Sequence, residues 1–196
     1  MDAEQQGAVK RRAGHVPGEE GVWVLIMGDM LVFSIFFATY LIYRAQNVVL
    51  YTSSQLSMQR GFGLFNTVLL LTSSWFVALA VSEARAGGRE RAMRLLLGAF
   101  ACGIGFVVSK AFEWGGKIQA GITLNSNEFY IFYYMLTGIH LLHVLIGLIV
   151  LGYLIARSRR PDPGASYVLV MEGGGAFWHL VDLLWIVLFA LLYLVR

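Results

Sequence analysis

Residues 129–153 read FYIFYYMLTGIHLLHVLIGLIVLGY, a run with two histidines and no other ionisable side chain apart from tyrosine phenols. As an α-helix this run extends roughly 37 Å, which exceeds the hydrocarbon core of a bilayer, about 30 Å thick. It therefore predicts a transmembrane helix with some tilt. His140 and His143 are three residues apart, so both rings lie on one side of the helix. Because polar side chains at membrane depth usually face protein, we expect this side to take part in function.

The composition is that of an integral membrane protein. Hydrophobic residues make up 58% of the chain and charged residues 14%, whereas about a quarter of a soluble domain is charged. Apolar runs near the ~20 residues that a membrane helix needs predict five spans, over residues 22–43, 62–81, 95–112, 129–153 and 176–195. The connecting loops are too short for a soluble domain. We predict an all-α fold, in which a polar tail at residues 1–19 precedes a single five-helix transmembrane domain at residues 20–196.

The distribution of basic residues predicts the orientation, because cytoplasmic loops retain lysine and arginine. Ten of the fifteen basic residues flank the same side of the predicted spans: Lys10, Arg11, Arg12, Arg85, Arg89, Arg91, Arg94, Arg157, Arg159 and Arg160. This places the N-terminus in the cytoplasm and the C-terminus on the opposite side. The net charge of +3 follows from this topology, and nucleic-acid binding has no support. The polar N-terminal residues lack the pattern of a cleavable signal peptide, so we expect the first span to remain in the mature protein.

Two aspartates lie in the inner half of the predicted membrane. Asp29 is roughly 10 Å from the cytoplasmic end of the first span, where a charged side chain costs about 2.5 kcal/mol or more. It either fixes helix packing through a hydrogen bond or handles protons, and we predict that it is buried against the fourth or fifth span. Asp182 lies three residues after His179 at roughly 9 Å depth. His143 reaches a similar depth, which permits a cluster of all four side chains.

The end of the third span contains three ionisable residues with helical spacing. Lys110 and Glu113 are three residues apart, and Glu113 and Lys117 are four apart. This spacing predicts an ion pair at the membrane interface. In the second span, hydroxyl residues such as Ser73 and Ser74 favour close helix packing.

The connections between the spans carry few signals of function. Residues 44–61 are expected to be a polar loop without a recognisable site. Residues 82–94 contain a Gly-Gly turn among alternating charges and predict a solvated hairpin. Residues 115–128 are expected to be a second loop, whose final Asn125, Ser126 and Asn127 are suited to cap the following helix.

The histidines and carboxylates invite a metal or haem hypothesis, since such side chains on membrane helices can hold iron. A di-iron bundle needs more carboxylates than these spans offer. His140 and His179, the possible haem pair, differ in depth by roughly 10 Å. Cys102 is the only cysteine, so neither an internal disulfide nor a thiolate metal site is available. With no nucleotide or triad motif either, we expect no metal or cofactor in this chain and no independent enzyme activity.

Two classes of function remain. Transporters tend to have repeated halves and helices broken at mid-membrane, whereas here no proline lies within any span and five helices offer no repeat. Short loops and scattered polar residues favour an accessory subunit of a larger membrane complex. A small protein that conducts protons or solutes by itself is the alternative.

Several segments resemble subunit III of the haem-copper oxidases. YMLTGIHLLHVLIG (134–147) and FWHLVDLLWIVLFALLYL (177–194) resemble its two signature segments. LIMGDMLVFSIFFATYLIY (25–43) resembles its first shared helix, and KAFEW (110–114) an Ala-x-Glu-aromatic helix end. The resemblance covers residues 19–194 and implies seven family-type buried polar positions: Asp29, Glu113, His140, His143, Glu172, His179 and Asp182. Glu172 stands where the family has a glutamate shortly before its last span.

The resemblance also implies a role. Subunit III of this family carries no haem or copper, packs against the catalytic subunit I, holds phospholipid and helps maintain proton uptake and stability. The chain lacks the first two helices of seven-helix members, as short members of the bacterial inner membrane do. Aspartate at position 29 is similar to the quinol-oxidase branch of the family and to the five-helix members associated with nitric oxide reductase, and residues 18–30 together with 66–76 resemble the latter most. We therefore expect a non-redox accessory subunit in aerobic electron transport or denitrification. Haem, with copper or non-haem iron, is expected only in the partner.

Overall fold

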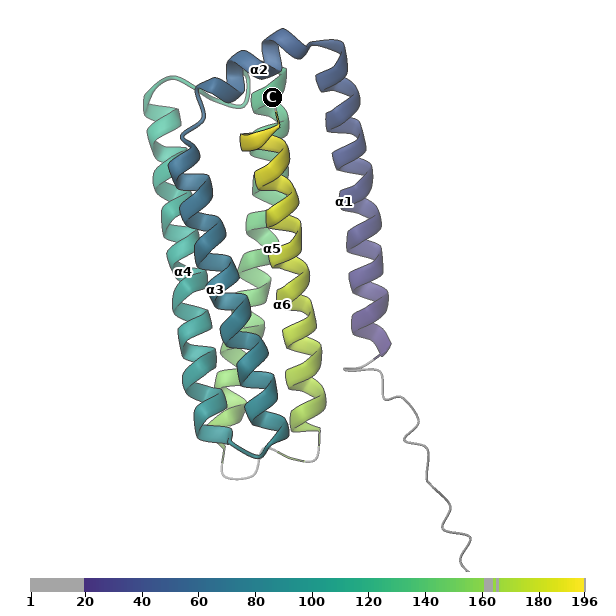
Figure 1. The fold of residues 1–196 in the computed structure, drawn as a ribbon, viewed down its shortest axis with the longest axis vertical. Coiled ribbons are helices and arrows are strands. Elements are labelled where there is room, and N and C mark those ends of the chain that lie inside the picture. Colours follow the sequence, from purple (N-terminus) through teal and green to yellow (C-terminus); the bar gives the residue numbers. More distant parts are fainter. Residues whose placement is uncertain (1–19, 161–163, 165, 196) are drawn as a thin grey trace, which may run out of the picture.

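A computed structural model describes residues 20–160, 164 and 166–195 of the chain. The five long helices of the described residues run alternately in opposite directions, and the short helix α2 (Val48–Leu56) lies across one end of the bundle (Figure 1). The elements are α1 (Glu20–Gln46), α2 (Val48–Leu56), α3 (Arg60–Arg85), α4 (Arg89–Gln119), α5 (Glu128–Ser158), α6 (Tyr167–Phe189) and a terminal π-helical turn, η1 (Ala190–Leu194). Five helices are long and apolar enough to cross a membrane, which confirms the predicted number of spans. The predicted tail at residues 1–19 lies outside the described residues.

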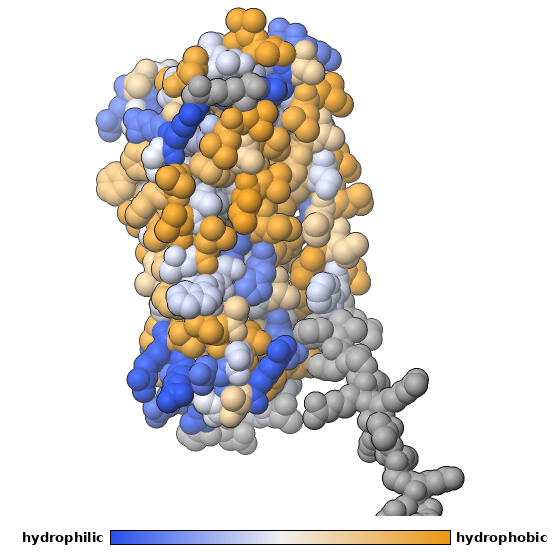
Figure 2. Space-filling view, in the orientation of Figure 1, coloured by the Kyte–Doolittle hydropathy of each residue, from blue (hydrophilic) through white to orange (hydrophobic). Residues whose placement is uncertain are grey.

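The long helices α3, α4, α5 and α6 form a four-helix bundle in which each helix packs against two of the others. Helix α1 lies to one side of this bundle, against α5 and α6 (Figure 1). Most of its apolar side chains are exposed, whereas α6 has the largest buried share of the five spans. Space-filling representation shows hydrophobic residues around the middle of the molecule and hydrophilic residues at its ends (Figure 2). This is the pattern of a bundle that crosses a bilayer.

One end of the bundle collects the start of α1, the turn between α3 and α4, the end of α5 and the start of α6 (Figure 1). The basic residues used to predict the orientation of the spans, within the described part of the chain, belong to these segments. The structure therefore agrees with the assumption behind the orientation prediction, namely that the basic segments all lie at the same end of the bundle. Which end faces the cytoplasm stays a prediction.

Several helices extend beyond the apolar spans predicted from the sequence. Helix α4 spans residues 89–119 rather than 95–112, because its polar ends remain helical beyond the apolar run. Helix α6 begins at Tyr167 rather than residue 176, so Glu172 lies inside it rather than before it. Glycines 173–175 continue the helix despite their low helix propensity. A Cβ on Gly174 would lie 2.9 Å from a methyl carbon of Leu154, so glycine permits the close approach of α5 and α6.

The prediction of a featureless loop at residues 44–61 is wrong, because helix α2 occupies its middle. Nine residues rarely form a stable helix alone, so tertiary contacts must hold α2. The ring of Tyr51 is fully buried, with its centroid 5.5 Å from that of Tyr40 and 5.8 Å from that of Phe129. Burial raises the pKa of Tyr51 far above its ordinary value, so the phenol stays neutral. Gln55 adds a hydrogen bond from its amide to the carbonyl of Leu191, at 2.9 Å.

The local signals for turns and caps are confirmed. Gly87 has a φ of +80° and lies in the short turn between α3 and α4, where a side chain would be strained. The side chain of Asn127 accepts a hydrogen bond from the backbone N–H of Tyr130 at 3.0 Å and thereby caps α5.

Candidate functional site

The seven polar residues that the sequence singles out do not form one site. Asp29 and His143 meet between α1 and α5, and His179 and Asp182 lie beside α3. Glu113 belongs to a buried ion pair near one end of the bundle. His140 is enclosed at mid-bundle, and Glu172 is ion-paired near the other end. These residues therefore form separate polar clusters in different parts of the bundle.

Asp29 and His143 form a pair across α1 and α5, with 3.5 Å between Oδ2 and Nε2. The contact with the fourth span is confirmed, but burial is only partial, since the Asp29 side chain is 26% exposed. His143 Nδ1 lies 2.8 Å from the carbonyl of Ile139, which only accepts, so Nδ1 carries a proton. Nε2 therefore faces the carboxyl group, and a hydrogen bond there requires one more proton. The pair is suited to hold a shared proton between the two side chains.

His179 and Asp182 lie on α6 beside α3. Ser74 Oγ of α3 is 2.6 Å from His179 Nδ1, whereas Asp182 Oδ2 is 4.0 Å from that nitrogen, too far for a hydrogen bond. The carboxyl oxygens of Asp182 are buried and have no hydrogen-bond partner within the described residues. The predicted cluster of all four side chains is thus resolved into two pairs at different helix interfaces. The prediction grouped these side chains because their depths in the membrane agree. Depth does not determine which way a side chain faces, since that depends on the rotation of its helix about its axis.

The ion pair predicted from the spacing of Lys110 and Glu113 forms, and it lies buried inside the bundle. Lys110 Nζ is 2.8 Å from Glu113 Oε2, and the two side chains are 1% and 2% exposed. The hydroxyls of Tyr133 and Tyr193 donate to Glu113 Oε1 at 2.8 and 2.6 Å. The Lys110 ammonium also lies 4.9 Å from the ring centroid of Trp185. Tyr133, Tyr193 and Trp185, which are distant in the sequence, thus enclose the charge pair. The local spacing of the two charged residues cannot indicate this burial.

Lys117 is a second buried lysine beside this pair, and sequence reasoning missed its burial. Its residue is 8% exposed, and its Nζ lies 5.9 Å from the ring centroid of Tyr130 and 5.4 Å from that of Tyr133. We call Lys110, Glu113 and Lys117 with these aromatic rings the Lys–Glu cluster. The cluster contains two ammonium groups and one carboxylate, so it has an excess positive charge.

His140 is fully buried between Phe106 and Trp185, with ring-centroid distances of 5.7 and 5.3 Å. Neither ring nitrogen has a hydrogen-bond partner within the part of the chain that the structure describes. Asn66 on α3 and Ser109 on α4 are also buried with unpaired polar atoms, within the same limits. These residues lie inside the four-helix bundle and away from its lipid-facing surface.

Hydrogen bonds of the second span support its predicted packing role. Ser73 donates to the carbonyl of Ala99 on α4 at 2.9 Å and accepts from the indole of Trp178 on α6 at 3.0 Å. One hydroxyl thus joins three helices of the bundle. Near the end of the same helix, Arg85 Nε donates to Glu172 Oε1 on α6 at 2.8 Å.

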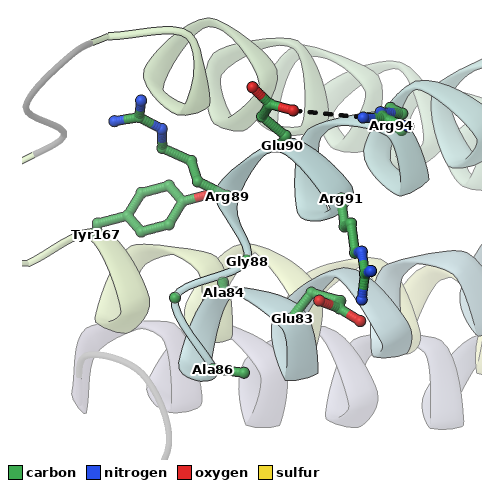
Figure 3. Close-up of a pocket in the computed structure, with 10 residues that line it drawn as sticks. Glu83, Ala84, Ala86, Gly88, Arg89, Glu90, Arg91, Arg94 and Tyr167 are labelled. Carbon is green, nitrogen blue, oxygen red and sulfur yellow. Dashed lines mark hydrogen bonds and ion pairs between the residues drawn. The ribbon is translucent and has the colours of Figure 1, made fainter.

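A hollow of about 810 Å³ lies where α3 turns into α4 (Figure 3). Its labelled side chains include both acidic and basic groups, and Glu90 is paired with Arg94 at 3.4 Å. The mixture of charges fits the solvated hairpin predicted from the sequence.

Within the described residues, His, Cys, Asp and Glu side chains do not form groups of three or more that could hold a metal ion. The expectation that the chain has no cofactor of its own stays a prediction.

The fold and these clusters define a helical membrane protein whose buried ionisable side chains lie at contacts between its own helices. The chain belongs to the cytochrome c oxidase subunit III family, whose model matches residues 17–195. This confirms the resemblance to subunit III of haem-copper oxidases. The roles of the seven polar positions stay predictions.

Individual relatives include both cytochrome c and quinol oxidase subunits. The probable cytochrome c oxidase subunit 3 of Mycobacterium leprae is 30% identical over 186 residues, which cover 90% of this chain and 87% of the relative. Quinol oxidase subunit 3 of Bacillus spizizenii is 27% identical over 176 residues, covering 89% and 85%. The haem-copper oxidase subunit I+III of Aeropyrum pernix is 29% identical over 183 residues, 89% of this chain. This chain spans only 22% of that longer protein.

Proposed function

We propose that this chain is a non-redox accessory subunit of a bacterial inner-membrane respiratory complex. It binds the haem-bearing catalytic subunit I of a haem-copper oxidase or nitric oxide reductase and supports its stability and proton uptake. Membership of the subunit III family supports this proposal. So does the Aeropyrum pernix relative, whose name joins subunits I and III in one protein.

His179 is the observation that carries the proposed partnership. Its side chain is 43% exposed near the middle of α6, and only its Nδ1 is bonded, to Ser74. Its Nε2 has no hydrogen-bond partner within the described residues, and an apolar lipid chain cannot provide one. A hydrophilic patch interrupts the apolar surface over α3 and α6 (Figure 2). A partner protein with a polar group opposite His179 would satisfy this nitrogen.

Other polar groups on the membrane-facing surface do not need such a partner. The hydroxyls of Ser34, Thr39 and Thr72 each donate to the backbone carbonyl four residues earlier, at 2.7 to 2.8 Å. Leu71, Trp75 and Leu183 are exposed on the same face as His179. We therefore assign the α3–α6 face around His179 to the catalytic subunit.

Asp29 and His143 support the proposed link to proton uptake. Their geometry accommodates one proton between a carboxyl oxygen and an imidazole nitrogen, 3.5 Å apart. Both members of the pair are partly accessible from outside the bundle. With that proton present, the two side chains together carry no net charge.

Co-purification tests the proposed function. The tagged chain is extracted in mild detergent, and the material that accompanies it is identified by mass spectrometry and by its optical spectrum. A haem-bearing catalytic subunit is expected, and assays of oxygen and nitric oxide consumption distinguish an oxidase from a nitric oxide reductase. The segments at residues 18–30 and 66–76 favour the latter. A colourless protein that stays alone under gentle extraction would instead support the conducting alternative.

A substitution at His179 tests the docking face. His179→Phe removes the exposed nitrogen and is expected to reduce recovery of the catalytic subunit at least about tenfold, which corresponds to about 1.4 kcal/mol. Ile149→Phe on the exposed surface of α5 is the control and should leave recovery unchanged. Both variants should elute as folded protein at the wild-type position. Equal recovery from folded His179→Phe and Ile149→Phe proteins would rule out this face.

A further inference from the structure

Asp182 lies behind His179, on the inner side of the α3–α6 face. Its side chain is 5% exposed and that of His179 is 43% exposed, with 4.0 Å between Oδ2 and Nδ1. Neither carboxyl oxygen of Asp182 has a hydrogen-bond partner within the described residues. A carboxylate enclosed without donors is costly, so this carboxyl group retains its proton. It is then an O–H donor that needs an acceptor.

Ser74 faces both of these side chains from α3. Its Oγ is 2.6 Å from His179 Nδ1, and it is also the hydroxyl that faces the Asp182 carboxyl group. Thr67 and Thr72 on the same helix donate their hydroxyls to backbone carbonyls four residues earlier, at 2.8 Å. Ser74 instead directs its hydroxyl at the imidazole. Because a hydroxyl donates one hydrogen bond and accepts others, it can join the carboxyl group to the ring.

Two indole hydrogen bonds hold α3 and α6 in register around this contact. The indole of Trp178 donates to Ser73 at 3.0 Å, and that of Trp185 donates to Thr67 at 3.0 Å. Trp178 precedes the imidazole in the sequence and Trp185 follows it. The short distance between the serine hydroxyl and the imidazole is therefore supported by the packing of two helices.

Two arrangements of hydrogen atoms are compatible with these three side chains. In the first, Asp182 donates to Ser74, Ser74 donates to His179 Nδ1, and Nε2 carries the ring hydrogen. In the second, Nδ1 donates to Ser74, Ser74 donates to the carbonyl oxygen of Asp182, and the O–H of Asp182 has no acceptor. A buried donor without an acceptor is rarer in proteins than a carbonyl oxygen without a donor. The first arrangement is therefore favoured.

We propose that Asp182 and Ser74 are positioning residues that fix His179 as a hydrogen-bond donor, and that the catalytic subunit presents an acceptor oxygen opposite Nε2. This inference rests on the proposed function, because it assigns the chemistry of the docking face around His179. An N–H group that is buried in an interface without an acceptor is destabilising. The complementary group is a carboxylate, an amide oxygen or a free backbone carbonyl. A lysine or arginine side chain does not fit, since it offers only donors.

Nitrogen NMR of the full chain with isotope-labelled histidine reads the tautomer of each ring. The purified chain is measured in detergent at mildly alkaline pH, where imidazoles are neutral, and His179→Phe identifies the His179 signals by their loss. His143 is an internal reference for the opposite tautomer, because its Nδ1 donates to the carbonyl of Ile139 at 2.8 Å.

The His179 ring is expected to carry its hydrogen on Nε2, and the His143 ring on Nδ1. Ser74→Ala should give a mixture of both His179 tautomers, because the ring then has no fixed partner. Thr72→Val is the control on the same helix and should leave the tautomer unchanged, since Thr72 donates to its own helix backbone. A hydrogen on Nδ1 of His179 in the wild-type chain would overturn the proposal, as would an unchanged tautomer in Ser74→Ala.

Infrared spectroscopy tests the proton on Asp182 separately. The wild-type chain should show the carbonyl stretch of a protonated carboxylic acid. Asp182→Asn should remove this band, and Asp29→Asn, which changes the other aspartate within a span, should retain it. A wild-type spectrum in which Asp182→Asn removes no such band would show that Asp182 is ionised and would overturn the first arrangement.

The complex tests the acceptor on the partner. Binding of the co-purified subunit should move the Nε2–H proton signal of His179 downfield, as donation to an oxygen does, and an unchanged signal would overturn the assigned acceptor. Wild-type recovery of the subunit by His179→Phe would overturn the docking face, and the acceptor with it. Reduced recovery together with a hydrogen on Nδ1 would overturn the donor assignment alone and leave the proposed function standing.

Discussion

The buried pair of Lys110 and Glu113 makes a quantitative prediction about stability. Lys110→Met keeps most of the side-chain volume but leaves Glu113, at 2% exposure, with phenol donors only. Removing one partner of a buried ion pair costs about 3–5 kcal/mol of the free energy of unfolding. Glu113→Gln should cost a similar amount, because the Lys110 ammonium then faces neutral acceptors.

The double variant Lys110→Met with Glu113→Gln should be far more stable than the sum of the two losses. It contains no buried charge at this pair, and the amide oxygen of the introduced glutamine can still accept from Tyr133 and Tyr193. Replacement of a buried ion pair by neutral groups is often close to neutral, so we expect a loss below about 2 kcal/mol. The coupling between the two substitutions should therefore exceed about 4 kcal/mol.

Unfolding of the purified chain by sodium dodecyl sulfate in mixed micelles, followed by tryptophan fluorescence, measures these differences. Glu90→Gln and Arg94→Met provide a matched control on the same helix, since this pair is 3.4 Å apart and largely exposed. Each control substitution should change stability by less than about 0.5 kcal/mol. If the losses at Lys110 and Glu113 simply add, the two charges are screened by water and the enclosed cluster described above is incorrect.

Two further pairs of substitutions test the packing. Gly147→Ala should destabilise the chain by about 1–3 kcal/mol, because its Cβ would lie 2.7 Å from the ring of Trp178. Gly138→Ala, where the Cβ meets only an ordinary 3.7 Å contact, should be neutral or stabilising in thermal unfolding in detergent. Tyr51→Phe should leave stability equal or higher, since its buried hydroxyl has no partner within the described residues. Tyr40→Phe should lose about 1 kcal/mol, because its hydroxyl donates to a backbone carbonyl and accepts from an amide, both at 3.2 Å. A more stable Tyr40→Phe than Tyr51→Phe in the same assay would contradict these contacts.

The short helix α2 and the glycines of α6 show where local sequence signals fail. Residues 48–56 lack a long apolar run, and glycines 173–175 argue against a helix. Both segments are helical because distant side chains pack on them, Tyr40 and Phe129 against α2 and Leu154 against α6. Such tertiary contacts outweigh an unfavourable helix propensity, which for glycine is about 1 kcal/mol per residue.

The sequence by itself determined the five spans, the turn at Gly87, the cap at Asn127 and the family resemblance. These features depend on the length of apolar runs and on hydrogen bonds between residues close in the chain. Only the tertiary structure decided that the aspartates and histidines form two separate pairs and that Lys110, Glu113 and Lys117 are buried. Burial of a helix face depends on the rotation of each helix about its axis. That rotation is set by side chains far along the chain, here by Tyr133 and Tyr193 closing over Glu113.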